Sequence, residues 1–446
     1  MDFIERFRAA LKIQTWWPAG ASAGDAEAEA SLLRFQEFLA ESYPNFHRAA
    51  QRQVINPYSV LYRWPGTDNA ETAKANAVLI VAHYDVVPVE TEKWSVDPFG
   101  AEMKDGFIYG RGSLDMKAML ISFMEAAEKL CNTGFKPKCD IWFAFGGDEE
   151  RFGALGALEA VKWFTGQGQR FAWILDEGTP IVEDQIKNVS SPLAFVSIEE
   201  KGMLNLELSV TQEPGHASMP PKTQATAVLA RALCRIAKRP FPFILCSTVE
   251  SFFRQLAPLV PGFRGFAMRF ARRLGPLFFK AAASSPATAA ILRTTAAMTQ
   301  LEGSLADNVL PSEVRAVINL RLLQPWTVES AMAFIKKAVK DERVRIRVRG
   351  ANTNPVTANR DYESVGWLKI RAALAETWPG VPMLPFIMVA ATDSRHFKEL
   401  AADIFRFNPY KLSTKEMGGV HGHDERISLE NLNQGLKFYT KLLETL

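Results

Sequence analysis

Three short apolar runs, each followed closely by a polar motif, constrain the fold of this chain most strongly. They span residues 77–81, 140–145 and 171–175. Residues 77–81 are apolar without interruption, as expected for a strand that is buried on both faces of a sheet, and only Asp140, at the start of the second run, is charged. Helical patterns at residues 116–130 and 155–164 separate the runs. Strands that alternate with helices predict an α/β fold with a mostly parallel sheet.

Ligands of such sheets collect beyond the carboxyl ends of the strands. The motifs that follow the three runs contain His83, the acidic stretch 148–150 and Asp176. Asp115 ends a Gly-Arg-Gly-Ser-Leu-Asp motif, and His421 lies in a glycine-rich loop. Two imidazoles with several carboxylates provide the ligands of a two-metal hydrolase. We therefore expect these motifs to converge on a metal site.

Each motif alone also has a simpler interpretation. His83 and Asp85 point the same way on an extended segment, so Asp85 can fix the tautomer of a metal-bound His83. A lone His-x-Asp also fits a structural histidine. Asp115 can cap the helix that follows it. The adjacent acids Glu149 and Glu150 can form a solvated loop, or one can bind metal while the other faces the substrate water.

The hydrophobic pattern changes near Glu200. Apolar and polar residues alternate over residues 203–210, which predicts a half-exposed antiparallel strand. The following β-α-β-β-α-β-like stretch predicts a smaller α+β domain at residues 200–352. This lid domain would be inserted into a catalytic domain made of residues 1–199 and 353–446.

The segment 241–300 fits neither pattern, and we expect one or two amphipathic helices added to the inserted domain. Its phenylalanines and arginines are interleaved, and they include Phe252, Phe253, Phe263, Phe266, Phe270, Phe278, Phe279, Arg254, Arg264, Arg269, Arg272 and Arg273. These phenylalanines can pack against the domain, line a groove for a long acyl chain, or contact a membrane surface.

Composition restricts the partners and the compartment. The net charge is +3 and the basic residues are scattered, which argues against a nucleic-acid partner. The four cysteines show no Cys-x-x-Cys spacing, so a zinc knuckle or disulfide framework is not expected. The N-terminal residues do not resemble a signal peptide, and no apolar stretch is long enough for a membrane span. We expect a cytoplasmic protein.

Taken in order, the motifs resemble those of the M20 family of metallopeptidases over nearly the whole chain. They occupy residues 83–85, 110–115, 148–150, 176–178, 214–220 and 421–425. Two further stretches, Asp-Asn-Val-Leu-Pro from residue 307 and Thr-Asp-Ser-Arg-His-Phe from residue 392, resemble the carboxypeptidase S branch. That branch includes N-fatty-acyl-amino-acid hydrolases.

The resemblance implies specific roles. By position, the ligands of one zinc ion would be His83, Asp115 and Asp176, and those of the second Asp115, Glu150 and His421, with His423 as an alternative. Glu149 would be the general base, and Asp85 would be a further catalytic residue, the one that orients His83. His216 would stabilise the oxyanion after lid closure. Asn308 and Arg395 would contact the substrate. Arg395 would bind the carboxylate of the substrate through a bidentate pair.

The expected activity is hydrolysis of an amide in a peptide or N-acyl amino acid with a free carboxylate. A small dipeptidase or deacylase of the same family is the alternative among enzymes. A metal-dependent binding protein that has lost catalysis is the alternative from another class, although the presence of Glu149 argues against it. Some family members dimerise through the inserted domain, so a monomer and a homodimer both stay open.

Overall fold

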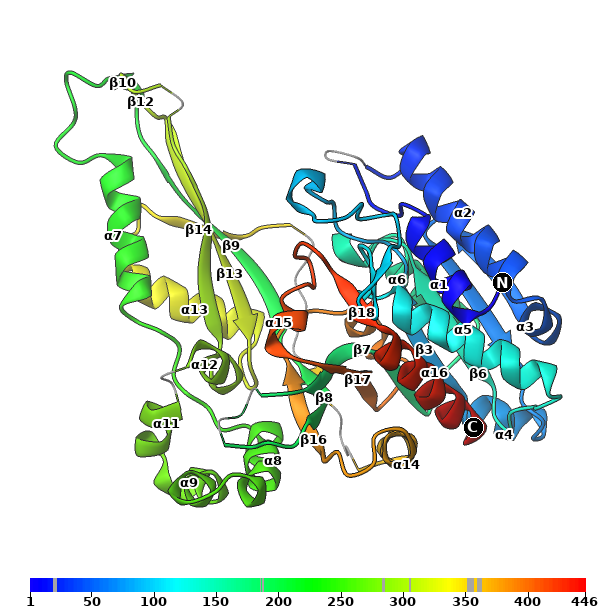
Figure 1. The fold of residues 1–446 in the computed structure, drawn as a ribbon. Coiled ribbons are helices and arrows are strands. Elements are labelled where there is room, and N and C mark those ends of the chain that lie inside the picture. Colours follow the sequence, from blue (N-terminus) through cyan, green and yellow to red (C-terminus); the bar gives the residue numbers. More distant parts are fainter. Residues whose placement is uncertain are drawn as a thin grey trace.

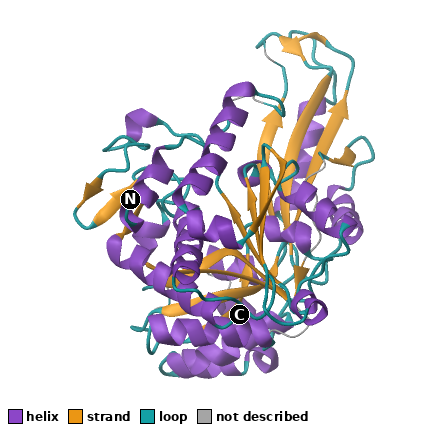
Figure 2. Cartoon of the chain, turned by 90° about the vertical axis from the view of Figure 1, so that its right-hand side faces the viewer, coloured by secondary structure: helices purple, strands orange, loops and turns teal. Residues whose placement is uncertain are grey.

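Figure 1 shows the computed structural model, in which a large layered domain carries a smaller, elongated one. The structure describes residues 1–446 except 19–21, 185, 187, 283–284, 305, 351–356 and 359–362. In the perpendicular view of Figure 2, the long strands of the smaller domain extend beyond the helices. Within the described ranges, no helix is long and apolar enough to cross a membrane.

The large domain is built on a nine-stranded mixed sheet. Its strands in spatial order are β1 (Gln51–Asn56), β2 (Ser59–Trp64), β6 (Ile141–Gly146), β3 (Val78–His83), β7 (Trp173–Val182), β17 (Ile404–Leu412), β8 (Leu193–Glu200) and β15 (Thr357–Ala358), with β16 (Met383–Met388) also paired to β8. The central strands β6, β3, β7 and β17 run parallel, and β16 is parallel to β8. The three predicted strands are confirmed as β3, β6 and β7.

Helices cover both faces of this sheet. One face carries α1 (Phe3–Lys12), α2 (Ala26–Ser42), α3 (Pro44–Ala49), α5 (Lys117–Asn132), α14 (Val365–Thr377) and α16 (Leu429–Glu444), and the other carries α6 (Ala157–Gly166) and η4 (Asp393–Phe397). On β3, Val78 and Ile80 join the first core, whereas Leu79 and Val81 join the second. Burial on both faces explains why the strand is a continuous apolar run.

Short elements complete the large domain. They are α4 (Ala70–Ala75), α15 (Thr414–Met417), the 3-10 helices η1 (Thr91–Lys93) and η2 (Glu149–Arg151), and the three-stranded sheet of β18 (Arg426–Ser428), β5 (Phe107–Tyr109) and β4 (Met103–Lys104). The small sheet matters for function because β18 follows the loop of His421 directly, while β5 precedes the loop of Asp115. It therefore ties together two loops that are distant in sequence.

The smaller domain is a four-stranded antiparallel sheet packed on two helices. Its strands in order are β11 (Thr295–Glu302), β13 (Glu313–Leu322), β9 (Gly202–Thr211) and β14 (Arg345–Val348), and its helices are α7 (Ala225–Ala237) and α13 (Val328–Val339). A two-stranded antiparallel sheet of β10 (Gly215–His216) and β12 (Val309–Leu310), which are distant in sequence, forms its far end (Figure 1). The chain leaves the large sheet after Glu200 and enters the small sheet at Gly202. The other predicted boundary, 352/353, lies outside the described residues, and the domain limits stay a prediction.

The described residues of the phenylalanine-rich segment form five α-helices where one or two were expected. They are α8 (Ser247–Leu256), α9 (Phe263–Arg269), α10 (Ala271–Leu274), α11 (Pro276–Ala282) and α12 (Pro286–Leu292), with η3 (Ala257–Leu259) after α8. Prolines at the starts of α11 and α12 divide the segment, because proline suits the first turn but not the middle of a helix. Phe252 packs on Phe195 of β8 and Phe386 of β16, so the segment also covers the edge of the large sheet.

Candidate metal centre

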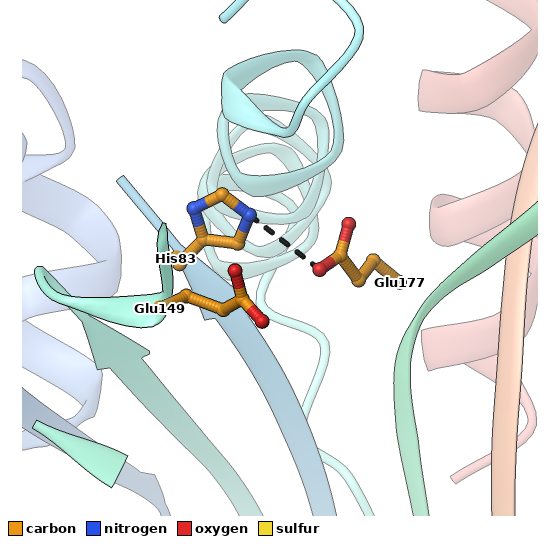
Figure 3. Close-up of side chains that lie close together, drawn as sticks. All are labelled: His83, Glu149 and Glu177. Atoms are coloured by element: carbon orange, nitrogen blue, oxygen red, sulfur yellow. Dashed lines mark ion pairs between the residues drawn. The ribbon is translucent and has the colours of Figure 1, made fainter. Parts of the chain in front are cut away.

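His83 ends strand β3 and is buried at the carboxyl edge of the parallel strands. Its Nδ1 faces Asp85, at 3.0 Å from the backbone oxygen and 3.4 Å from Oδ1. Its Nε2 lies 3.1 Å from Asp115 Oδ1 and 3.5 Å from Glu177 Oε1. Glu149 and Glu177 approach the imidazole from different sides (Figure 3). Because Asp85 occupies Nδ1, Nε2 is the nitrogen that is available to a metal ion.

Asp115 lies between two imidazoles. One carboxylate oxygen, Oδ1, faces His83, while Oδ2 lies 3.1 Å from Nε2 of His421. The same nitrogen of His421 lies 3.1 Å from Glu150 Oε1. A carboxylate with each oxygen directed at a different histidine has the geometry of a ligand that bridges two ions. The sequence motifs of Asp115, Glu150 and His421 are therefore brought together.

The loop before Asp115 is held by Glu425, a buried residue to which the sequence analysis assigned no role. Glu425 Oε2 accepts hydrogen bonds from Arg111 Nη1 at 2.6 Å and from the amide of Gly112 at 3.0 Å. Oε1 accepts from the amides of Leu114 and Asp115, at 2.7 and 3.1 Å. Gly112 has a φ of +82°, which glycine adopts readily. Glu425 thus joins the Asp115 loop to the chain that follows His421.

Asp85 positions both glutamates that follow β6. Its two carboxylate oxygens accept the amide hydrogens of Glu149 and Glu150, each at 3.1 Å. The two side chains then diverge, since Glu150 reaches His421 and Glu149 lies beside His83 and 3.5 Å from Arg395. The two adjacent acids therefore have different surroundings.

Asp176 was expected as a metal ligand, but the structure brings the next residue, Glu177, to His83 instead. Asp176 accepts hydrogen bonds from the amides of Glu177 and Ser394, both at 2.8 Å. Successive side chains of a strand point to opposite faces, so only one of these two acids can face His83. The Asp-Glu-Gly motif contained both candidates. The geometry favours Glu177, and Asp176 instead holds the turn that carries Arg395.

Arg395 is buried beside Glu149. Its Nη1 donates to the carbonyl oxygen of Thr392 at 2.6 Å. Nε and Nη2 have no hydrogen-bond partner among the residues that the structure describes. Buried donors without a partner are costly, so a guanidinium in this state is suited to receive an anionic group.

His216 and Asn308 lie apart from this cluster. His216 lies on β10 and Asn308 directly precedes β12, in the two-stranded β10–β12 sheet at the far end of the smaller domain (Figure 1). The amide of Ala217 donates to the carbonyl oxygen of Asn308 at 2.9 Å, and His216 Nδ1 lies 2.7 Å from Ser218 Oγ. The two residues are thus close to each other, and both are exposed.

The cluster is crowded with negative charge. Burial, together with neighbouring carboxylates, raises the pKa of Glu149 well above its usual range, and burial with Asp115 raises the pKa of Glu177 to about 8. Hydrogen bonds to Asp115 and Glu150 raise the pKa of His421 to about 10. Although burial opposes it, contact with two imidazoles holds the pKa of Asp115 below its usual range. Such crowded carboxylates favour bound cations.

The donor set fits divalent metal ions. Ligand atoms of His83, Glu149 and Glu177 lie within 4.8 Å of one another, as do those of His83, Asp115 and Glu150. Imidazole nitrogens with carboxylate oxygens are typical ligands of zinc, especially in catalytic sites. The chemistry of the residues therefore agrees with a metal centre at this edge of the sheet.

The profile of peptidase family M20/M25/M40 matches residues 79–445. The chain belongs to the M20 family. This M20 hydrolase is 32% identical to the N-fatty-acyl-amino acid synthase/hydrolase PM20D1 of Xenopus tropicalis, over 99% of this chain and 85% of that one. It is 33% identical to the probable carboxypeptidase S-like 2 of Dictyostelium discoideum, over 93% of this chain and 80% of that one.

Solved structures share the fold of the M20 hydrolase. The metallo-carboxypeptidase Sso-CP2 of Sulfolobus solfataricus superposes with a TM-score of 0.74 at 15% identity, over 100% of this chain and 99% of that one. Human carnosine dipeptidase 1 superposes with a TM-score of 0.69 at 16% identity, over 100% and 96%. The fold is therefore that of M20 structures, with a catalytic domain and a separate antiparallel lid domain.

Proposed function

We propose that this M20 hydrolase uses two divalent metal ions to cleave an amide bond in a substrate with a free carboxylate. We expect both ions to be zinc. The observation that carries the proposal is Asp115, whose two oxygens each face a different imidazole. The names of the relatives refer to N-fatty-acyl amino acids and to carboxypeptidases. Both substrate classes combine an amide with a nearby carboxylate.

In this proposal, His83, Asp115 and Glu177 would hold one ion, and Asp115 would hold the second with Glu150 and His421. When bound, two such ions lower the pKa of a shared water and stabilise the negative charge that develops on the carbonyl oxygen. The protein residues then have to orient the substrate, exclude water and move one proton.

Glu149 is the residue placed to move that proton. Its side chain is only 11% exposed, its pKa is raised, and Asp85 accepts a hydrogen bond from its backbone amide. A carboxylate in this state can take a proton from the attacking water and deliver it to the leaving amine, help that is typically worth about 10²–10⁴ in rate. Glu149→Gln keeps the shape of the side chain but cannot accept the proton.

Arg395 is placed to bind the substrate carboxylate. Its Nε and Nη2, unpartnered within the described part of the chain, form one side of the guanidinium fork. A carboxylate that accepts both would satisfy two buried donors at once. Because Arg395 also lies 3.5 Å from Glu149, the carboxylate would sit close to the general base.

His216 as oxyanion donor and Asn308 as substrate contact remain part of the proposal. Both need the β10–β12 sheet to reach the cluster, through closure of the smaller domain or from a second copy of the chain. The proposal therefore keeps both the monomer and the homodimer.

The proposal is tested with zinc-loaded protein and matched amides: N-acyl amino acids and dipeptides, each with a free or an amidated carboxylate. We expect the free carboxylate to be preferred, and Arg395→Lys to reduce that preference because an ammonium lacks the planar fork. Glu149→Gln should lose about 10² or more in kcat with its metal retained. Near-normal turnover by Glu149→Gln would remove it as the base. Binding without turnover in the parent protein would favour a binding protein, and preference for dipeptides a dipeptidase.

We also propose a cytoplasmic location. All four cysteines are free thiols, which persist in reducing compartments. Cell fractionation tests this, and recovery of the protein outside the cytoplasm would contradict it.

A further inference from the structure

A cavity of about 460 Å³ lies between the helical segment and the edge of the large sheet. Its buried wall is almost entirely apolar and is formed by Phe195, Phe252, Phe253, Leu256, Phe278 and Ile291. Binding sites for small molecules are typically about 300–1,000 Å³ in volume and lined mainly by apolar side chains. In size and lining, the cavity is therefore suited to an apolar ligand.

The opening of the cavity carries a basic residue. Arg264, Ala267 and Met268 face the cavity from α9, and Arg264 is exposed at the rim. Arg264 forms no ion pair within the ranges that the structure describes. On the same helix, Phe263 and Phe266 are exposed to solvent. The site thus has an apolar interior and a positive charge at its mouth.

The surrounding segment is strongly basic. Residues 241–294 carry seven basic side chains and one acid, Glu250, for a net charge of +6, whereas the whole chain has a net charge of +3. Glu250 is paired with Arg272. The local field around Arg264 therefore favours an anion.

The cavity is separate from the metal centre. None of its lining residues belongs to the carboxylate–histidine cluster. A volume of about 460 Å³ corresponds to roughly fifteen groups of the size of water, enough for one long chain but not for two.

We propose that this cavity is a second binding site, for a single-chain carboxylate amphiphile. The alkyl chain lies among Phe195, Phe252 and Phe253, and the carboxylate pairs with Arg264 at the rim. Fatty acids and N-acyl amino acids share this chemistry. Binding here requires no catalysis, so the site goes beyond the proposed hydrolysis and can be tested without it.

The test uses the full chain and the fluorescent fatty acid cis-parinaric acid, displaced by linear alkyl carboxylates of eight to eighteen carbons. We expect affinity to rise about fourfold per methylene, equivalent to ~0.8 kcal/mol, until the cavity is full. Displacement by N-acyl glycines of the same chain lengths shows which of the two sources binds more tightly. An affinity that does not change with chain length would overturn the proposal.

Variants locate the binding. Ala267→Trp fills the cavity and should weaken binding of the probe by at least about tenfold; Ala267→Leu, a smaller change, should weaken it less. Arg264→Gln should weaken dodecanoate by about two- to fivefold, as expected for an exposed ion pair, and leave dodecanol unchanged. Arg269→Gln, on the same helix but outside the cavity, is the control and should leave both unchanged. Unaltered binding in folded Ala267→Leu and Ala267→Trp would place the ligand elsewhere.

A lipid surface is the competing occupant, because Phe263 and Phe266 are exposed beside basic residues. In that case the protein would bind vesicles of anionic phospholipid, and Phe263→Ser with Phe266→Ser would abolish binding of both vesicles and probe while Ala267→Trp would not. That result would overturn the cavity proposal. Failure of either kind would leave the metal centre untouched, because no step of the test measures turnover.

Discussion

Replacing Glu425 by glutamine should destabilise the large domain, although the new side chain has the same shape. Both the Glu425 carboxylate and the Arg111 guanidinium are almost completely buried, with side-chain exposures of 0% and 3%. Glutamine can retain the hydrogen bonds to the amides of Leu114 and Asp115. Its NH₂ group then faces Arg111 and Gly112, which are both donors.

The expected loss follows from these contacts. Removing one partner of a buried ion pair typically costs about 3–5 kcal/mol, because the other charge is left uncompensated. Glu128→Gln provides a matched control in the same domain. Glu128 is also a buried carboxylate, and its hydrogen-bond donors among the described residues, Asn45 and Phe46, are neutral. One unpaired amide should cost about 1–3 kcal/mol there.

Urea denaturation followed by circular dichroism measures both variants against the parent. A chelator is added to all samples, so that bound metal does not contribute to the free energy of unfolding. Because both residues lie in the large domain, the same transition is compared. We expect the Glu425→Gln midpoint to fall clearly below that of Glu128→Gln. Equal urea midpoints for the two variants would contradict the reasoning, because they would show that Glu425 does not stabilise the fold by compensating the buried charge of Arg111.

Two further predictions concern the ligands. Glu177→Ala should lose metal, whereas Asp176→Ala should keep it and weaken recognition of the substrate carboxylate; the reverse result, measured by elemental analysis, would restore Asp176 as the ligand. In metal-free protein, pKa values of about 10 for His421 and about 8 for Glu177 mean that both groups are protonated at pH 7. Metal binding must displace these protons, so affinity should rise with pH from 7 towards 10, and calorimetry in two buffers should detect proton release. Binding without proton release would contradict this.

The catalytic half of the fold could be predicted because local patterns determine it. β3, β6 and β7 are buried on both faces, so their apolar runs identified them, and the polar residues after them had to meet at one edge. His421 could not be placed this way, because it is brought to Asp115 by the contacts of Glu425. These contacts join residues more than 300 positions apart.

Two predictions depended on geometry that the sequence does not specify. Asp176 and Glu177 are adjacent, and which of them faces His83 depends on how β7 leaves the sheet. The phenylalanines of the segment 241–300 indicated an apolar surface but not its shape. Their division between a buried wall, with Phe252 and Phe253, and an exposed face, with Phe263, arises from packing against β8 and β16.

The metal content of Asp115→Ala tests the central claim most directly. After loading with zinc and dialysis, the parent protein should contain about two zinc ions per chain, measured by inductively coupled plasma mass spectrometry. Glu149→Gln should contain the same number. Because Asp115 is the only residue assigned to both ions, Asp115→Ala should lose both. Two ions retained in Asp115→Ala, with the parent affinity, would contradict the assignment of this cluster as a bridged two-metal centre.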